Sequence, residues 1–163
     1  KADSVILMAG ERKDELGGSV YYSLHDELGT NVPEPDFEDV KNQIYALTDC
    51  IDDCLILSCH DIADGGAASA LAEMTFGNGI GCDVEIETDL SLDKILFSET
   101  GGFILEVSTH NVTRVREGFS EYGQTIFNIG KTNFSNSIKL NRVINLDLDK
   151  AKDAWDDGLR QKL

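Results

Sequence analysis

Short apolar runs alternate with segments of helical periodicity along this chain, and the alternation limits the folds open to it. Residues 4–9 (SVILMA) and 54–59 (CLILSC) are largely apolar runs of strand length, which predicts two buried strands. Between such runs, apolar residues recur every three to four positions, as in helices that cover a sheet. The predicted order is β-α-α-β-α-β-α-β-α-β-β-β-α. We therefore expect an α+β fold, a mixed sheet covered by helices, in one domain of residues 1–163.

Individual elements follow from caps and periodicity. Asp36 is placed to cap a helix that buries four apolar residues, Val40, Ile44, Leu47 and Ile51. Residues 82–87 alternate in polarity, which predicts a half-buried strand. The remaining predicted strands are 102–107, 125–131, 137–140 and 143–146, and the remaining predicted helices are 19–28, 67–76, 90–97, 111–122 and 148–159, the last with Leu148, Trp155 and Leu159 on one face.

The charge excludes several classes of partner. Fourteen Lys and Arg against thirty Asp and Glu give a formal charge of −16. This excess repels phosphate backbones and anionic lipids, so we expect neither nucleic acid nor membrane as a partner. No apolar run approaches the roughly 18 residues of a membrane span, and nothing at the N-terminus resembles a signal peptide. We expect a cytoplasmic location, and the lack of an initiating Met suggests part of a longer polypeptide.

The four cysteines do not form a recognisable metal motif. Cys50, Cys54 and Cys59 have the spacing C-x3-C-x4-C, with Cys82 far along the chain, which matches neither a zinc ribbon nor a finger. His60 follows Cys59, but adjacent strand residues point to opposite faces. We expect mostly buried, reduced thiols.

Residues 60–66 (HDIADGG) form the strongest candidate site. A predicted strand ends there and a helix begins, so two glycines and the first helical amides could approach a phosphate closely. Asp61 and Asp64 supply hard oxygen ligands that could hold Mg²⁺ on that phosphate. The alternative is purely structural: Asp64 caps the helix, Gly65 and Gly66 form a tight turn, and His60 is a polar residue at a strand end.

Residues 98–102 (SETGG) form a second candidate. They lie between a predicted short helix and a strand, where Ser98 and Thr100 can donate hydrogen bonds and the glycines expose amides. The alternative is a helix end followed by a turn.

These motifs together resemble a known family. The segments HDIADGGAASALAEM, GIGCDVEI (79–86), LFSETGGFILEV (96–107) and LGGSVYY (16–22), with the closing residues 148–163, resemble the C-terminal domain of the aminoimidazole ribonucleotide synthetase superfamily. Within it the chain is most similar to the second half of the phosphoribosylformylglycinamidine synthase family, because it has His60-Asp61 and Ser98-Glu99-Thr100 at the two loops.

The resemblance implies a purine-biosynthesis ligase. Such enzymes convert formylglycinamide ribonucleotide to formylglycinamidine ribonucleotide with ATP, Mg²⁺ and glutamine-derived ammonia. The implied partners are the N-terminal domains of the same synthase and, in multi-subunit forms, glutaminase and small accessory subunits. The chain alone is expected to be inactive, with no catalytic residue of its own. The implied phosphate- or nucleotide-binding candidates are His60, Asp61, Asp64, Gly65, Gly66, Ser98 and Glu99, with Asp61 and Asp64 as metal ligands.

Two departures weaken the implied phosphate site. The family usually has Ser where this chain has Ala63, and often Arg where it has Gly102, so one neutral and one charge-assisted anion contact are missing. The alternative is a structural and assembly module of the enzyme without a ligand site. Separated from its partner domains, the chain is expected to expose an apolar patch and to be prone to self-association.

Overall fold

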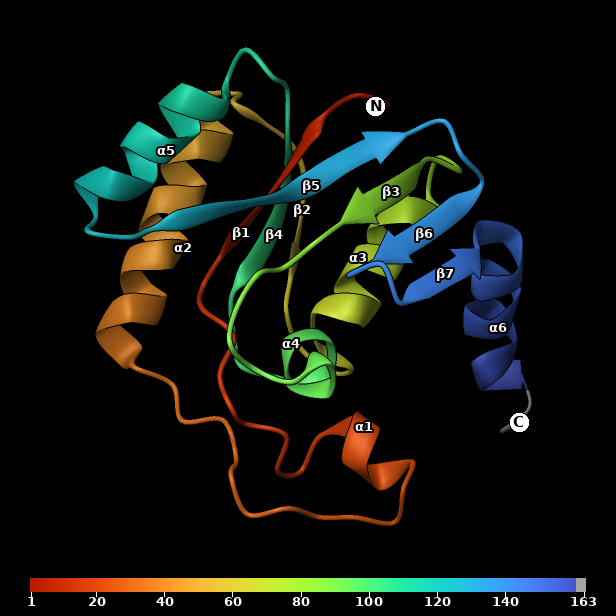
Figure 1. Cartoon of the computed structure of the whole chain (residues 1–163). Helices are drawn as coiled ribbons and strands as arrows, with labels where there is room; N and C mark the ends of the chain where they lie inside the picture. The colour runs from red at the N-terminus through yellow and green to blue at the C-terminus, as the bar shows by residue number, and fades with distance from the viewer. Residues whose placement is uncertain (161–163) are drawn as a thin grey trace.

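A computed structural model describes the backbone of residues 1–160 and the side chains of residues 1–158. Within this range the elements follow the predicted order (Figure 1). The strands are β1 (Val5–Ala9), β2 (Ile56–Asp61), β3 (Gly81–Val84), β4 (Phe103–Val107), β5 (Ile126–Asn133), β6 (Ser137–Leu140) and β7 (Ile144–Asp147). The helices are α1 (Val20–Ser23), α2 (Phe37–Asp52), α3 (Gly66–Phe76), α4 (Leu92–Phe97), α5 (Val112–Glu121) and α6 (Leu148–Arg160).

The strands form one mixed sheet in the order β2-β4-β1-β5-β3-β6-β7. Only the β3–β6 pair is parallel, and the other neighbours are antiparallel. The predicted α+β class, with helices on a mixed sheet, is therefore confirmed.

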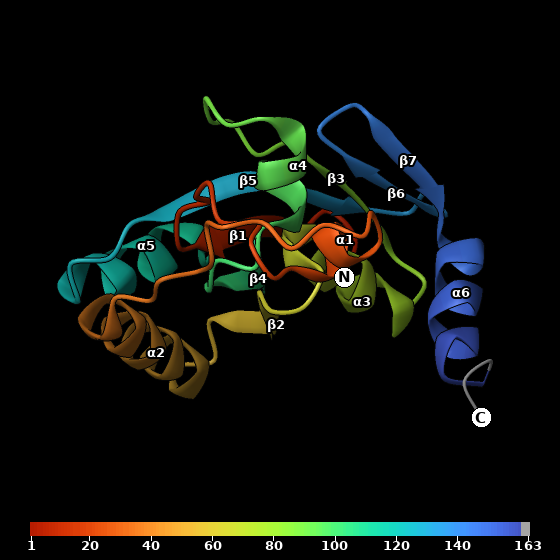
Figure 2. The same ribbon diagram turned by 90° about the horizontal axis from the view of Figure 1, so that it is seen from below.

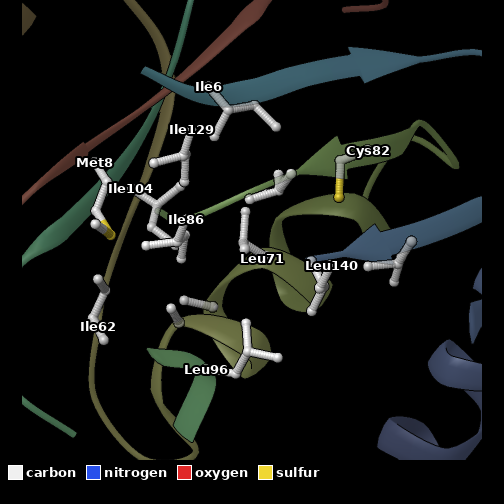
Figure 3. Packing of buried hydrophobic residues seen from close by; sticks show 14 of the residues in the cluster. Ile6, Met8, Ile62, Leu71, Cys82, Ile86, Leu96, Ile104, Ile129 and Leu140 are labelled. Carbon is white, nitrogen blue, oxygen red and sulfur yellow. The ribbon is translucent and has the colours of Figure 1, made fainter. Parts of the chain in front are cut away.

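Both faces of the central strands are buried. In β1, Ile6 and Met8 face a cluster with α3 and α4, whereas Leu7 and Ala9 face a second cluster with α2 and α5. Figure 3 shows the first cluster, and Figure 2 shows α2 and α5 on the opposite side of the sheet from α4. Burial on both faces explains why β1 reads as a continuous apolar run.

The prediction that residues 54–59 form a buried strand is wrong. β2 pairs only with β4 and lies at the edge of the sheet, where Leu57 is 49% exposed. The same placement exposes Cys59, and Cys54 is exposed as well, so only Cys50 and Cys82 match the expectation of buried thiols.

Helix α2 begins after Asp36, whose carboxylate accepts from the amides of Glu38 and Asp39, as predicted. Its buried face differs in part from the prediction. Leu47 is buried as predicted, together with Ala46 and Cys50, but Ile44 and Ile51 are 42% and 44% exposed. The small side chains of Ala46 and Cys50 on this face let α5 approach α2 closely. The closeness is seen at Gly118 of α5, where an added Cβ would lie 3.0 Å from Cys50 Sγ.

One further expectation needs correction. The helix predicted over 19–28 ends at Ser23, and the chain reverses so that Gly17 and Gly18 donate to the carbonyls of Asn31 and Leu28. The helix predicted over 148–159 is confirmed as α6; Trp155 on it is 57% exposed, and the side chain of Leu159 lies outside the described residues. None of the helices in the described part of the chain combines the length and apolar character needed to cross a bilayer.

Candidate functional site

The two candidate loops meet at one end of the β2–β4 pair. His60 pairs with Ile104 and Asp61 with Phe103, and the Ile62 amide donates to the Gly102 carbonyl at 2.8 Å. The structure thereby brings residues 60–66 and 98–102 together, although they are separated by over 30 positions in the sequence.

The glycine pair begins α3. Gly65 is the N-cap residue at φ +78°, without a side-chain cap bond, so the alternative expectation that Asp64 caps this helix is wrong. Gly66 has φ +69°, and a Cβ there would lie 2.6 Å from the Leu96 carbonyl oxygen. A glycine is therefore required for α3 to pack against the end of α4.

Glu99 joins three segments at this point. Its Oε1 accepts from the Gly65 amide at 2.9 Å and from the Val20 amide at 2.8 Å. An internal carboxylate thus lies at the N-terminus of α3, where the helix dipole favours negative charge. The Gly66 amide also has a partner, the Ala63 carbonyl at 3.0 Å. The amides of Gly65 and Gly66 are therefore already bonded within the chain. A phosphate at this turn would have to accept hydrogen bonds from the amides that follow Gly66 in α3, or displace Glu99 from the Gly65 amide.

Ser98 lies beneath the surface. It is fully buried, and its Oγ is 3.5 Å from the Thr100 hydroxyl, which also donates to Glu15. Its carbonyl accepts from Arg12. Ser98 therefore faces the interior of the turn.

His60 lies between two carboxylate residues. Its Nε2 is 3.0 Å from Glu73 Oε2, and its Nδ1 is 2.6 Å from the Asp61 carbonyl oxygen. Desolvation lowers the pKa of His60, but these hydrogen bonds raise it more, so the net shift is upward. The imidazolium form is favoured because it can donate to both partners.

The two proposed metal ligands are accessible. The Asp61 side chain is 66% exposed, and Asp64 is exposed too. Within residues 1–158 no group of three or more His, Cys, Asp or Glu side chains is arranged to hold a metal ion. Two carboxylates fit Mg²⁺ only when phosphate and water complete its coordination.

Arg12 is the residue that the sequence did not single out. It is only 7% exposed, and its guanidinium donates to the carbonyls of Ser98 and Gly101. Burial lowers the pKa of Arg12 to about 10, with Glu15 opposing the shift. A Cβ at Gly102 would lie 2.4 Å from the Ala9 carbonyl oxygen and 3.2 Å from Arg12 Nη2. A guanidinium thus reaches this turn from another position, and Gly102 has no room for a side chain.

Comparisons with known proteins agree with the expected family. Residues 1–141 match the model described as AIR synthase related protein, C-terminal domain. The whole chain aligns over 170 positions with phosphoribosylformylglycinamidine synthase subunit PurL of Methanothrix thermoacetophila at 33% identity, covering 22% of that protein. It is 34% identical to the PurL subunit of Methanocaldococcus jannaschii over 161 residues, covering 93% of this chain and 21% of the relative.

Solved structures show the same fold. The Thermotoga maritima PurL complexed with FGAR superposes with a TM-score of 0.80 at 17% identity, covering 93% of this chain and 28% of that one. The T. maritima PurLQS structure gives a TM-score of 0.74 at 18% identity, with 93% and 26% covered.

The chain spans about a fifth of the length of the curated relatives it matches. The family model covers most of the chain, and the similarity to PurL continues along all of it. The chain belongs to the family of AIR synthase related proteins, whose C-terminal domain it matches, and it is homologous to the PurL subunit.

Proposed function

We propose that residues 1–163 form one C-terminal-type domain of an ATP-dependent C–N ligase, phosphoribosylformylglycinamidine synthase. The observation that carries this is the 33% identity with PurL along the whole chain. The longer protein would convert formylglycinamide ribonucleotide to the amidine in purine biosynthesis, with ATP and glutamine-derived ammonia.

In this proposal the domain forms one wall of a phosphate- or nucleotide-binding cleft. The exposed carboxylates of Asp61 and Asp64 would hold Mg²⁺, which neutralises phosphate charge when bound. His60, Gly65 and Gly66 would border the same wall. Glu99 would position the turn from below, because it accepts from the Gly65 amide. Ser98 would act through the shape of its loop, since its side chain is buried.

The other wall would come from the N-terminal domains of the same polypeptide. Leu24, Leu28 and Phe37 are 76%, 77% and 80% exposed along residues 20–37, which suits burial against another domain. We further propose a cytoplasmic enzyme that uses glutaminase and small accessory subunits where these are separate chains. A PurLQS structure exists for the T. maritima relative.

The test is turnover by the polypeptide that contains this chain. ADP formation is measured with and without formylglycinamide ribonucleotide and ammonia. We expect ADP only when both are present, and none from residues 1–163 alone. The proposal fails if the folded polypeptide forms no ADP, or forms it equally without the ribonucleotide.

A structural and assembly role is the second candidate. It is favoured by the internal partners at the turn: Glu99 binds the Gly65 amide, and Gly66 packs directly against the backbone of α4. In that case substitution of the exposed Asp61 and Asp64 carboxylates leaves turnover of the full enzyme unchanged.

A further inference from the structure

A cavity of about 950 Å³ lies beside the first half of β5, away from the HDIADGG loop. β3 runs along the second half of β5, and after Val84 the chain leaves it and turns toward α4 (Figure 1). Only β1 therefore pairs with residues 126–128 of β5. The cavity is lined by the segment 85–89, by residues of β1 and β5, and by Arg12 and Arg116.

Its two arginines differ from the others that the structure describes. Arg114 pairs with Asp53 at 3.4 Å, and Arg142 with Glu85 at 2.6 Å. In the described part of the chain, neither Arg12 nor Arg116 lies within ion-pair distance of a carboxylate. The lining also includes acidic residues, but among the residues that the structure describes none of them forms an ion pair with either arginine.

Arg12 makes the stronger case. It is more than nine-tenths buried, and its Nε has no hydrogen-bond partner in the structure. Of five N–H donors, only two have carbonyl acceptors. Glu15 offsets part of the cost of burying this guanidinium, but no carboxylate of the described chain forms an ion pair with it, and an anion in the cavity would stabilise the charge further.

We propose that this cavity binds the oxyanion group, carboxylate or phosphoryl, of a small organic ligand. Arg12 and Arg116 contact the oxyanion, and the apolar body of the ligand lies against Phe127, a partly exposed lining residue on β5. Guanidinium groups suit either oxyanion because their N–H donors match two oxygens at once. The lining includes no residue of the HDIADGG turn, and Arg12 connects it to the second candidate loop through the carbonyls of Ser98 and Gly101.

The rim of the cavity tunes this binding. Glu85 is paired with Arg142, but Glu11, Glu87 and Asp89 are exposed lining residues. Their charge opposes the entry of a simple anion, so the affinity is modest and sensitive to each rim carboxylate. Glu87→Gln therefore tightens binding of an oxyanion ligand.

Calorimetric titration of the purified chain tests the proposal with three probes: phenyl phosphate, benzoate and inorganic phosphate. Arg116→Gln is the diagnostic variant, because Arg116 is exposed and its loss spares the fold. Arg114→Gln is the matched control, two residues away on α5 and paired outside the cavity. Arg12→Lys provides a second test, with its fold checked by circular dichroism.

We expect phenyl phosphate or benzoate to bind at millimolar concentration, more tightly than inorganic phosphate. The tighter of the two identifies the oxyanion as phosphoryl or carboxylate. Arg116→Gln weakens binding by about tenfold, the loss of roughly one charge-assisted hydrogen bond, and Arg114→Gln leaves it within about twofold. The proposal is overturned if neither organic probe binds, or if both arginine variants weaken binding equally.

Discussion

Replacing Gly66 by alanine should destabilise the chain through packing, before any effect on a ligand. The new Cβ would lie 2.6 Å from the Leu96 carbonyl oxygen and 2.8 Å from Phe97 Cα. Both are backbone atoms, so α3 and α4 must move apart. Gly66 also has φ +69°, where an L-residue is strained.

The expected loss is the sum of two effects. The left-handed backbone costs about 1–2 kcal/mol for alanine, and overpacking costs about 1–3 kcal/mol more. A total of about 2–5 kcal/mol is a large part of the roughly 5–15 kcal/mol that stabilises a domain. Gly79→Ala is the matched control, since Gly79 has φ +62° with no atom within 4 Å of the added Cβ. Gly79→Ala should therefore lose only the free energy that the left-handed backbone costs, without the cost of overpacking.

Urea unfolding of both variants measures the difference in the free energy of unfolding. We expect Gly66→Ala to be less stable than Gly79→Ala by about 1–3 kcal/mol, with a similar denaturant dependence. Equal losses within about 0.5 kcal/mol would refute the packing argument. If the difference is found, lost activity in Gly66→Ala cannot be attributed to a phosphate contact.

Three further outcomes are expected. Asp36→Ala removes the cap of α2 and should lower the free energy of unfolding by about 1 kcal/mol in urea titrations; no change would contradict the capping role. Burial raises the pKa of Cys82 to about 12, so iodoacetamide at about pH 8 should modify exposed Cys54 but spare Cys82 until the chain unfolds; peptide mass mapping of the alkylated chain decides this, and labelling of Cys82 in the folded chain would contradict it. The raised pKa of His60 means that its contribution to stability is complete below the unfolded pKa of about 6.5 and is lost as pH rises through the folded pKa. Glu73→Gln should therefore lower the pKa of His60 measured by NMR, and it should destabilise the chain more at about pH 6 than at about pH 9. An unchanged NMR titration of His60 would show that Glu73 does not stabilise the imidazolium.

Local patterns predicted the elements well where burial is symmetrical or strictly alternating. β1 is buried on both faces and reads as a continuous apolar run. In β3 and the residue pair after it, Cys82, Val84 and Ile86 are buried in alternation. Each of these signals is contained in a few adjacent residues.

Errors arose where distant parts of the chain decide the outcome. The run 54–59 is largely apolar, as is the run 4–9, but the strand that forms is β2 at Ile56–Asp61, and its edge position depends on which strands pair with β4. The buried face of α2 depends on the close approach of Gly118 to Cys50 across two helices. Periodicity alone leaves such choices open.

The candidate site shows the same division. The sequence located both loops, and the β2–β4 pairing brought them together. The sequence could not show that Glu99 accepts hydrogen bonds from the amides of Val20 and Gly65, which are 79 and 34 positions away. Nor could it show that Arg12 donates to a carbonyl of the second loop. A single arginine in a polar loop has no periodic signature.

Turnover of the full synthase carrying Asp64→Asn tests the central claim most directly. Asp52→Asn, at the distant end of α2, is the control, and neither carboxylate has a hydrogen bond or ion pair within the described chain. Both variants should therefore keep the melting temperature of the parent. The account predicts that Asp64→Asn lowers ribonucleotide-dependent ADP formation by at least about tenfold, as expected for a lost metal ligand, while Asp52→Asn does not. Equal activity of the two variants would contradict a phosphate-binding role for this loop.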